Sequence, residues 1–445
     1  MQKILSKIQF LNFNSYEFER YFKNTFWLFL EKGLRISIGF IVSIYLARYL
    51  GPTQYGTLNY SLSFVYLFYA LATLGLDQIV VKSVIDHPES KDKILATSFW
   101  LRIIGSLLAV ILIGIIIQWT PNDLLTKGMI LIIASGMIFQ SFNIIDLYFQ
   151  SQVLSRHVVL VQIIQVIFSA ALKLLFIAWN ADLIWFAIAI FIDNMTLAAG
   201  LLFIYSKREG GLKLELWDFD QAVQLLKRVL PLILAILAVT FYMRIDQILI
   251  KEMLGVKEVG IYAICVQLCE IWNIIPAVLA SSLFPALIKI KKTDLELYKR
   301  RIQNFYDFLV ILSVIIIIPI LIFADNIIEI FFGKAYISSI YPLRIYILGN
   351  IFSFLGIASS YWRINENLEK ITFYISLAAA VINIILNLLF IPIWGISGAA
   401  LAMLITLFFN SYLADLLFKS TLVSFTIKTK SLLLENVIKK LLRKF

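Results

Sequence analysis

The chain has 445 residues, of which 61% are hydrophobic and 15% are charged, and its net charge is +11. This balance is the reverse of that of a soluble domain and indicates an integral membrane protein. The basic residues flank apolar stretches, where they fix membrane orientation and meet anionic lipid headgroups. We therefore expect membrane lipids as partners and no nucleic acid.

About twelve apolar stretches follow one another along the chain, each of roughly 20 residues, which is the length that crosses a bilayer core of about 30 Å. In the first half these predicted spans begin near Asn24, Asn59, Ile94, Gly128, Val158 and Asp182. In the second half they begin near Val229, Val259, Phe305, Ala335, Ile371 and Ile396. The pattern predicts an all-α, multi-pass membrane protein.

Lysine and arginine collect in every second gap between the predicted spans. The intervening gaps hold only Arg48, Lys127, Lys251, Lys257 and Lys334. Because basic loops stay in the cytoplasm, this asymmetry places both termini on the cytoplasmic side. The longest connection is 207–228, and no gap is large enough to fold a soluble catalytic domain. We therefore expect a transporter rather than an enzyme, with no catalytic residues.

A faint internal repeat divides the chain in two. Leu50-Gly51 and Gly56 follow the first span as Leu254-Gly255 and Gly260 follow the seventh. Six spans in each half give both halves the same orientation, so we predict two six-helix bundles around a central cavity, related by a pseudo-twofold axis along the membrane normal. The expected segments are a cytoplasmic N-terminal segment 1–23, an N-lobe 24–206, a cytoplasmic linker 207–228, a C-lobe 229–418 and a basic amphipathic tail 419–445.

Ionisable residues lie within several predicted spans, where an unpaired charge costs at least about 2.5–3.5 kcal/mol. They should therefore line a hydrated interior or pair with one another. Polar residues share a helix face with some of them, as Gln165 and Ser169 do with Lys173. Asp77, Arg102 and Arg344 lie towards span ends, where long side chains are expected to reach the interface. The submerged residues are Glu31, Arg35, Asp146, Lys173, Asp193, Arg244, Asp246 and Glu270.

Ordered motifs run along nearly the whole chain. They are Asn24 to Trp27 with Lys32 and Arg35, Ala47 to Pro52, Tyr55-Gly56, Leu58 to Tyr60, Leu74 to Asp77, Arg244 to Asp246, Gly260 to Tyr262, Ser282 to Pro285, Ala380 to Asn383, Leu386-Asn387, Ile391-Pro392 and Gly395 to Ala400. Together they resemble the polysaccharide-export, or O-antigen, flippases of the multidrug/oligosaccharidyl-lipid/polysaccharide exporter superfamily.

This resemblance implies a cargo, a place and partners. The cargo would be an oligosaccharide repeat unit on polyprenyl diphosphate, moved by alternating access from the cytoplasmic to the outer leaflet of the bacterial cytoplasmic membrane. The product would serve the synthesis of surface polysaccharide such as O-antigen, capsule or exopolysaccharide. Polysaccharide polymerase and glycosyltransferases would be its partners, and no resident cofactor is expected. The energy source stays open between a gradient of H⁺ or Na⁺ and polymerisation outside.

The three submerged cations suit such a cargo, because arginine supplies a forked donor for phosphate oxygens and lysine a point charge. We predict that Arg35, Lys173 and Arg244 form a cationic substrate-binding cavity. The submerged carboxylates are candidates for ion coupling or cavity lining. Each also has a structural alternative, such as a pair between Glu31 and Arg35 one turn apart. The candidate carboxylates are Glu31, Asp146, Asp193, Asp246 and Glu270.

Other functions stay open. A multidrug or cation exporter of the same superfamily would share the fold and would need an anionic or apolar cavity. An oligosaccharide polymerase or ligase would need a long extracytoplasmic loop, and a scaffolding protein would have little reason to carry submerged charges. We expect no metal site, because His87 and His157 lack ligand spacing and Cys265 and Cys269 fit packing positions.

Overall fold

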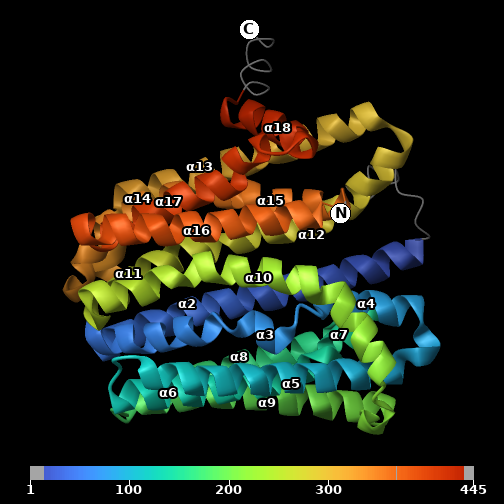
Figure 1. The fold of residues 1–445 in the computed structure, drawn as a ribbon, viewed down its shortest axis with the longest axis horizontal. Coiled ribbons are helices and arrows are strands. Elements are labelled where there is room, and N and C mark those ends of the chain that lie inside the picture. Colours follow the sequence, from blue (N-terminus) through green and yellow to red (C-terminus); the bar gives the residue numbers. More distant parts are fainter. Residues whose placement is uncertain (1–14, 367, 435–445) are drawn as a thin grey trace.

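The computed structural model describes residues 15–366 and 368–434, and in these ranges the regular structure is entirely helical. The two halves of the chain form two bundles that lie side by side (Figure 1). The first half contains α2 (Ser15–Tyr66), α3 (Tyr69–Thr73), α4 (Asp77–Asp86), α5 (Lys91–Ile116), α6 (Leu124–Ser135), α7 (Ile144–Ser151), α8 (Arg156–Ala178) and α9 (Leu183–Glu209). The predicted all-α architecture is confirmed.

The second half begins with α10, which packs against α2, α11 and α16. It contains α10 (Phe219–Leu254), α11 (Val256–Glu270), α12 (Ile274–Thr293), α13 (Leu295–Ile327), α14 (Ile340–Leu348), α15 (Asn350–Asn365), α16 (Glu369–Trp394), α17 (Ile396–Ser411) and α18 (Leu422–Leu432).

Ten helices of the described chain are long and apolar enough to cross a membrane, and a pair bent by 43° at residue 349 makes an eleventh candidate. The first candidate, Trp27–Tyr66, has 40 residues and would be roughly 60 Å long if straight, which is twice the bilayer core. Its backbone is not helical at Gly51. It therefore holds the first predicted span and the start of the second, and the count agrees with twelve.

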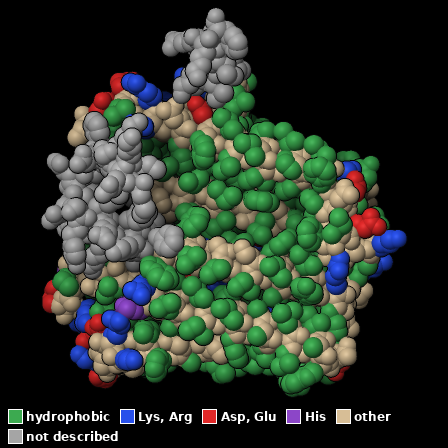
Figure 2. Space-filling model, turned by 180° about the vertical axis from the view of Figure 1, so that it is seen from behind, with side chains coloured by type: hydrophobic (Ala, Val, Ile, Leu, Met, Phe, Trp, Pro, Cys, Tyr) green, Lys and Arg blue, Asp and Glu red, His purple; other side chains and the backbone are tan. Residues whose placement is uncertain are grey.

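The surface has the pattern of a protein embedded in lipid. Hydrophobic side chains cover the broad middle of the face seen in Figure 2, and charged side chains gather towards its two ends. Exposed apolar residues such as Ile111, Ile164 and Phe203 would be costly in water but face acyl chains favourably.

Two glycines of the repeat turn the chain at one end of the bundles. Gly51 has φ 63° and ψ 174°, and Gly255 has φ 98° and ψ 169°, a backbone region that is open essentially to glycine alone. Each glycine joins two consecutive helical segments. We call this end of the molecule the glycine end, and the other, which carries the lysine-rich connections, the basic end.

The other two repeat glycines bring the lobes into contact. A Cβ atom on Gly56 would lie 1.9 Å from the Val256 carbonyl oxygen, and one on Gly260 would lie 2.0 Å from the Pro52 carbonyl oxygen. Each glycine thus fits against the start of the opposite helix, α11 or the second segment of α2. The reciprocal contact places the repeat axis between Gly56 and Gly260.

The predicted domain boundaries stay predictions. Within the predicted linker 207–228, α9 continues to Glu209 and α10 already begins at Phe219. Residues 1–14 of the predicted N-terminal segment and 435–445 of the predicted tail lie outside the described residues.

We predict that Gly56→Ala and Gly260→Ala each destabilise the protein, because the new methyl group would overlap backbone atoms that cannot rotate away. Overpacking of this kind costs about 1–3 kcal/mol. Thermal unfolding in detergent measures the effect. Gly33→Ala is the matched control, since a Cβ there meets nothing within 4 Å. Equal melting temperatures for all three variants would contradict the close crossing.

Candidate substrate cavity

Two adjoining cavities lie along α2. One lies between the two lobes, and the other lies within the N-lobe. The first, of about 670 Å³, is lined by α2, α10, α11 and the start of α12. The second, of about 440 Å³, lies against α8 and α9 in the N-lobe. Both share a wall of α2 that includes Arg35 and Ser43. The predicted cavity at the lobe interface is therefore present, and it extends into the N-lobe.

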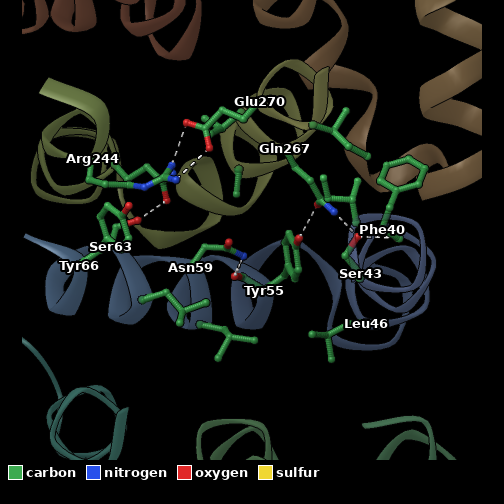
Figure 3. Close-up of a pocket in the computed structure, with 18 of the residues that line it drawn as sticks. Phe40, Ser43, Leu46, Tyr55, Asn59, Ser63, Tyr66, Arg244, Gln267 and Glu270 are labelled. Carbon is green, nitrogen blue, oxygen red and sulfur yellow. Dashed lines mark hydrogen bonds and ion pairs between the residues drawn. The ribbon is translucent and has the colours of Figure 1, made fainter. Parts of the chain in front are cut away.

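Arg244 of α10 lies in the first cavity and meets Glu270 of α11 (Figure 3). Its two terminal nitrogens donate to the two carboxylate oxygens at 3.2 and 2.8 Å, and its guanidinium stands 5.2 Å from the ring centre of Tyr66. The paired side chains are 20% and 21% exposed. A forked, charge-assisted contact of this kind is strong, yet both groups keep access to the cavity.

Lys173 of α8 lies in the second cavity. Its Nζ donates to Oδ2 of Asp193 on α9 at 2.6 Å and to Oγ of Ser169, one turn earlier in α8, at 2.8 Å. Gln165 and Asn194 line the same space. The polar face that the sequence places along α8 thus points into a cavity, and the inter-helix partner of Lys173 is Asp193.

Arg35 lies on α2 where the two cavities meet. Its Nε donates to Oε1 of Glu31 at 2.5 Å, so the pair that the sequence left open is formed. Arg35 is nevertheless 42% exposed, more than Lys173 or Arg244. All three predicted cations therefore line the joined cavities, and each is balanced by a carboxylate.

Two candidate carboxylates lie elsewhere. Asp246 is fully buried between α10 and α11, where it accepts hydrogen bonds from the Tyr262 hydroxyl at 2.8 Å and from the backbone N–H of Gln247 at 2.7 Å. Asp146 lies on α7 and is absent from the lining of both cavities. The structure thus places Glu270 and Asp193 in the cavities, sets Glu31 beside them through Arg35, and does not bring Asp146 or Asp246 to their walls.

Gln267 is a site residue that charge alone did not reveal. It lies between the lobes (Figure 3), where its amide donates to Oγ of Ser43 and its Oε1 accepts from the Tyr55 hydroxyl at 3.1 Å. In the same cavity Ser63 donates to Oε1 of Gln247 at 2.8 Å. Uncharged polar groups thus link α2 to α10 and α11, and the polar spacing within each helix was their only sequence signal.

The glycine end of the cavity is sealed by bonds between the lobes. Arg48 of α2 donates to the backbone carbonyls of Ile330 and Phe331, the former contact being very short and the latter 2.7 Å. The Tyr336 hydroxyl donates to the Ala47 carbonyl at 2.7 Å. These contacts lie beside the Gly56–Gly260 crossing. The cavity therefore lies on the basic side of a closed layer.

The residues expected at span ends form ion pairs. Arg102 is buried in α5, where its guanidinium forms a short ion pair with Asp77 at the start of α4. Asp77 itself is 59% exposed, so the buried guanidinium of Arg102 reaches a carboxylate at the surface of the bundle. Arg344 does pair near the surface, with Asp325 at 2.6 Å.

The described membrane helices thus form two lobes around cavities that are lined by paired charges. The chain belongs to the family described as polysaccharide biosynthesis protein, whose model matches residues 21–291. It is also 32% identical over 190 residues to an uncharacterized membrane protein of Methanocaldococcus jannaschii. The matched segment covers 41% of this chain and 43% of the relative. The chain therefore spans less than half of the length of this relative.

Solved structures share the fold. An inward-facing multidrug resistance MATE family transporter of the MOP superfamily has a TM-score of 0.70 at 12% identity, with 92% of this chain and 99% of that one covered. The lipid II flippase MurJ in an inward closed conformation has a TM-score of 0.70 at 16% identity, with 95% and 93% covered. The predicted two-bundle membrane fold is thereby confirmed, and the family model bears out the resemblance to polysaccharide-export proteins.

We predict that Arg244 and Glu270 are energetically coupled. Removing one partner leaves the charge of the other unpaired inside the protein, which is destabilising. Removing both leaves no charge that needs a partner. A double-mutant cycle with Arg244→Gln and Glu270→Gln, followed by thermal unfolding, should give a coupling energy of about 1–3 kcal/mol, the size of hydrogen bonds to charged groups. Strict additivity would show that the contact does not hold α10 to α11.

Proposed function

We propose that this protein is a flippase that moves polyprenyl-diphosphate-linked oligosaccharide repeat units from the cytoplasmic to the outer leaflet of the bacterial cytoplasmic membrane. The basic end, with both chain termini, would face the cytoplasm, as the distribution of lysine and arginine suggests. The sealed glycine end would face outward, so the structure would represent a state open towards the inside.

The observation that carries the proposal is the joined cavity with Arg35, Arg244 and Lys173 on its walls. A diphosphate must leave water to cross the bilayer, and its desolvation is the main barrier. Cations held in a polar, hydrated cavity replace the lost hydration. Arg35 is the most accessible of the three and stands between the two spaces, which suits it to make the first contact with the headgroup.

The carboxylates would take part by exchanging partners with the cargo. A guanidinium fork matches a carboxylate and a phosphate equally well, so a phosphate could replace Glu270 on Arg244. The displaced carboxylate would then be a buried anion beside another anion, which favours uptake of a proton or of Na⁺. Asp193 on Lys173 offers the same exchange, and this links cargo binding to an ion gradient.

Alternating access would rock one lobe against the other about the Gly56–Gly260 crossing and open the seal at Arg48. The sugar would lie in the N-lobe cavity, beside the polar side chains of Gln165 and Asn194. Consumption of the repeat unit by a polymerase outside, and its supply by glycosyltransferases inside, would give the transport its direction.

One observation favours a second function. Glu31, Asp193 and Glu270 balance the three cations, so the cavity is not strongly positive. A multidrug exporter of lipophilic cations could use these carboxylates as its binding groups. The two functions assign opposite roles to the members of the same ion pairs, which makes them separable.

We predict opposite effects of two substitutions on binding of a polyprenyl diphosphate to the purified protein in lipid nanodiscs. Arg244→Ala should weaken binding about 10- to 100-fold, since charged hydrogen bonds contribute about 1.5–3 kcal/mol and 1.4 kcal/mol is tenfold. Glu270→Gln should leave binding equal or tighter, because it removes the competing carboxylate. Arg344→Ala, outside the cavities, should change nothing.

The same variants are then titrated with tetraphenylphosphonium, a lipophilic cation. Binding of this cation that is lost in Glu270→Gln, together with diphosphate binding that is indifferent to Arg244, would overturn the flippase proposal and favour the exporter.

A further inference from the structure

The C-terminal helix α18 turns a row of polar side chains towards the C-lobe and leaves several apolar side chains exposed. Thr421, Ser424, Lys428 and Ser431 recur every three or four residues on one side, and all four are buried against the C-lobe. The other side exposes Leu422, Val423 and Leu433, which are 41%, 55% and 66% exposed, together with Thr426 and Lys430.

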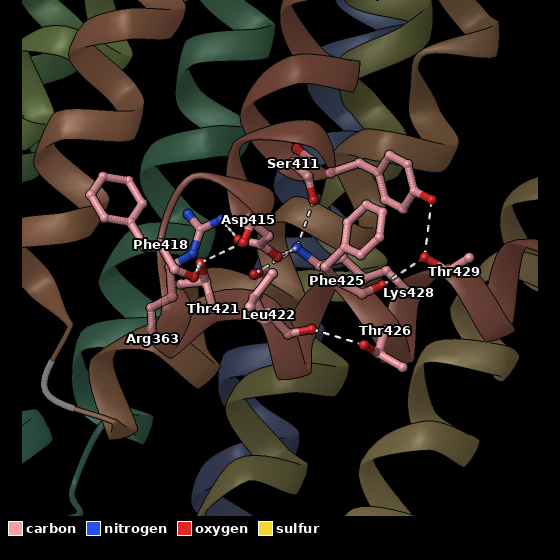
Figure 4. Close-up of polar contacts among 12 residues, drawn as sticks. Arg363, Ser411, Asp415, Phe418, Thr421, Leu422, Phe425, Thr426, Lys428 and Thr429 are labelled. Carbon is pink, nitrogen blue, oxygen red and sulfur yellow. Dashed lines mark hydrogen bonds and ion pairs between the residues drawn. The ribbon is translucent and has the colours of Figure 1, made fainter.

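A buried ion cluster holds the polar face (Figure 4). Asp415, just beyond α17, accepts from Arg363 of α15 at 2.7 Å on one side and from Lys428 of α18 at 2.7 Å on the other. Lys428 also donates to Oγ of Ser359 at 2.9 Å and to the Ser411 carbonyl at 2.6 Å. All three ammonium donors are therefore used, and the orientation of α18 is fixed.

A second anchor lies one turn further on. Ser431 donates to Oδ1 of Asp307 on α13 at 2.7 Å, while the Gln303 amide donates to Oγ of Ser431 at 2.7 Å and to the Ile427 carbonyl at 3.1 Å. The polar face is thus bonded to α13, α15 and the end of α17, and α18 cannot turn over to hide its apolar side.

The bilayer is the surface that fits the exposed side. The membrane span Ile396–Leu416 ends only five residues before α18, and five residues reach at most about 17 Å. Exposed Leu416 and Leu417 continue the apolar surface of the span towards Val423. Lys419 and Lys430 are exposed near the two ends of the helix. Figure 1 shows α18 on the outer side of the C-lobe, away from the lobe interface.

We propose that α18 is a lipid-binding helix: Leu422, Val423 and Leu433 lie in the leaflet that adjoins the basic end, and Lys419 and Lys430 bind anionic phosphate headgroups there. The ion cluster around Asp415 joins α18 to the C-lobe, so that binding of α18 to lipid also holds the C-lobe at the membrane surface. Transport chemistry is not involved, so the inference stands or falls independently of the flippase proposal.

The depth of the helix is tested with the full-length protein in vesicles of phosphatidylcholine and phosphatidylglycerol. An environment-sensitive fluorophore is attached to Val423→Cys, and nitroxides on shallow acyl positions serve as quenchers. Cys265 and Cys269 are buried, and labelling the unsubstituted protein measures the background fluorescence from these two cysteines. Quenching should exceed that of the exposed control Glu89→Cys about threefold or more, as for an interfacial helix. Equal quenching at both sites would overturn the proposal.

The role of the lysines is tested by the rise in melting temperature when phosphatidylglycerol is added to phosphatidylcholine nanodiscs, since a bound lipid stabilises the folded state. Lys419→Gln/Lys430→Gln should lose at least half of this rise. The control Lys82→Gln/Lys207→Gln removes two exposed cations from the basic end of the N-lobe and should keep it. An equal loss in both double variants, or none in either, would overturn headgroup binding by α18.

Discussion

The free-energy cost of an ionised side chain at bilayer depth governs how this protein is built. Arg244, Lys173 and Arg35 are each held by a carboxylate, and two of these pairs join different helices. The pairs are not enclosed by packed side chains, because they line adjoining cavities between the lobes and within the N-lobe. This combination lets the protein fold in a membrane without a cargo and still offer charged groups to one. A cavity with cations alone would be costly while empty, and one sealed around its pairs could bind nothing.

The internal repeat supplies the second constraint. Its glycines turn the chain at Gly51 and Gly255, and Gly56 and Gly260 bring the two lobes closer than any side chain would allow. The seal at Arg48 and Tyr336 lies beside this crossing, and the first cavity lies between the lobes on its basic side. Two similar bundles that cross closely at one end are what a rocking motion requires.

Much of this was accessible from the sequence, because span length, helical polar spacing and the glycine repeat are local signals. They predicted the helical bundles, the cavity and the placement of Arg35, Lys173 and Arg244 in it. Pairings between distant helices were not accessible, since they depend on rotation and depth. The sequence could not identify Asp193 as the partner of Lys173. It also suggested Asp246 as a cavity residue, whereas in the structure Asp246 accepts a hydrogen bond from Tyr262 in the core. Lys428 resembled an ordinary tail lysine, and only the fold shows that Asp415 and Arg363 surround it.

The central claim is that the cavity's ion pairs open to receive an anionic lipid headgroup. An experimental structure of the protein with a bound polyprenyl-diphosphate sugar tests it most directly. The account predicts that the diphosphate lies between Arg35 and Arg244 and that Arg244 and Glu270 move apart beyond the 4 Å limit of an ion pair. A diphosphate bound elsewhere, with the Arg244–Glu270 contact intact at its present 2.8 Å, would contradict it.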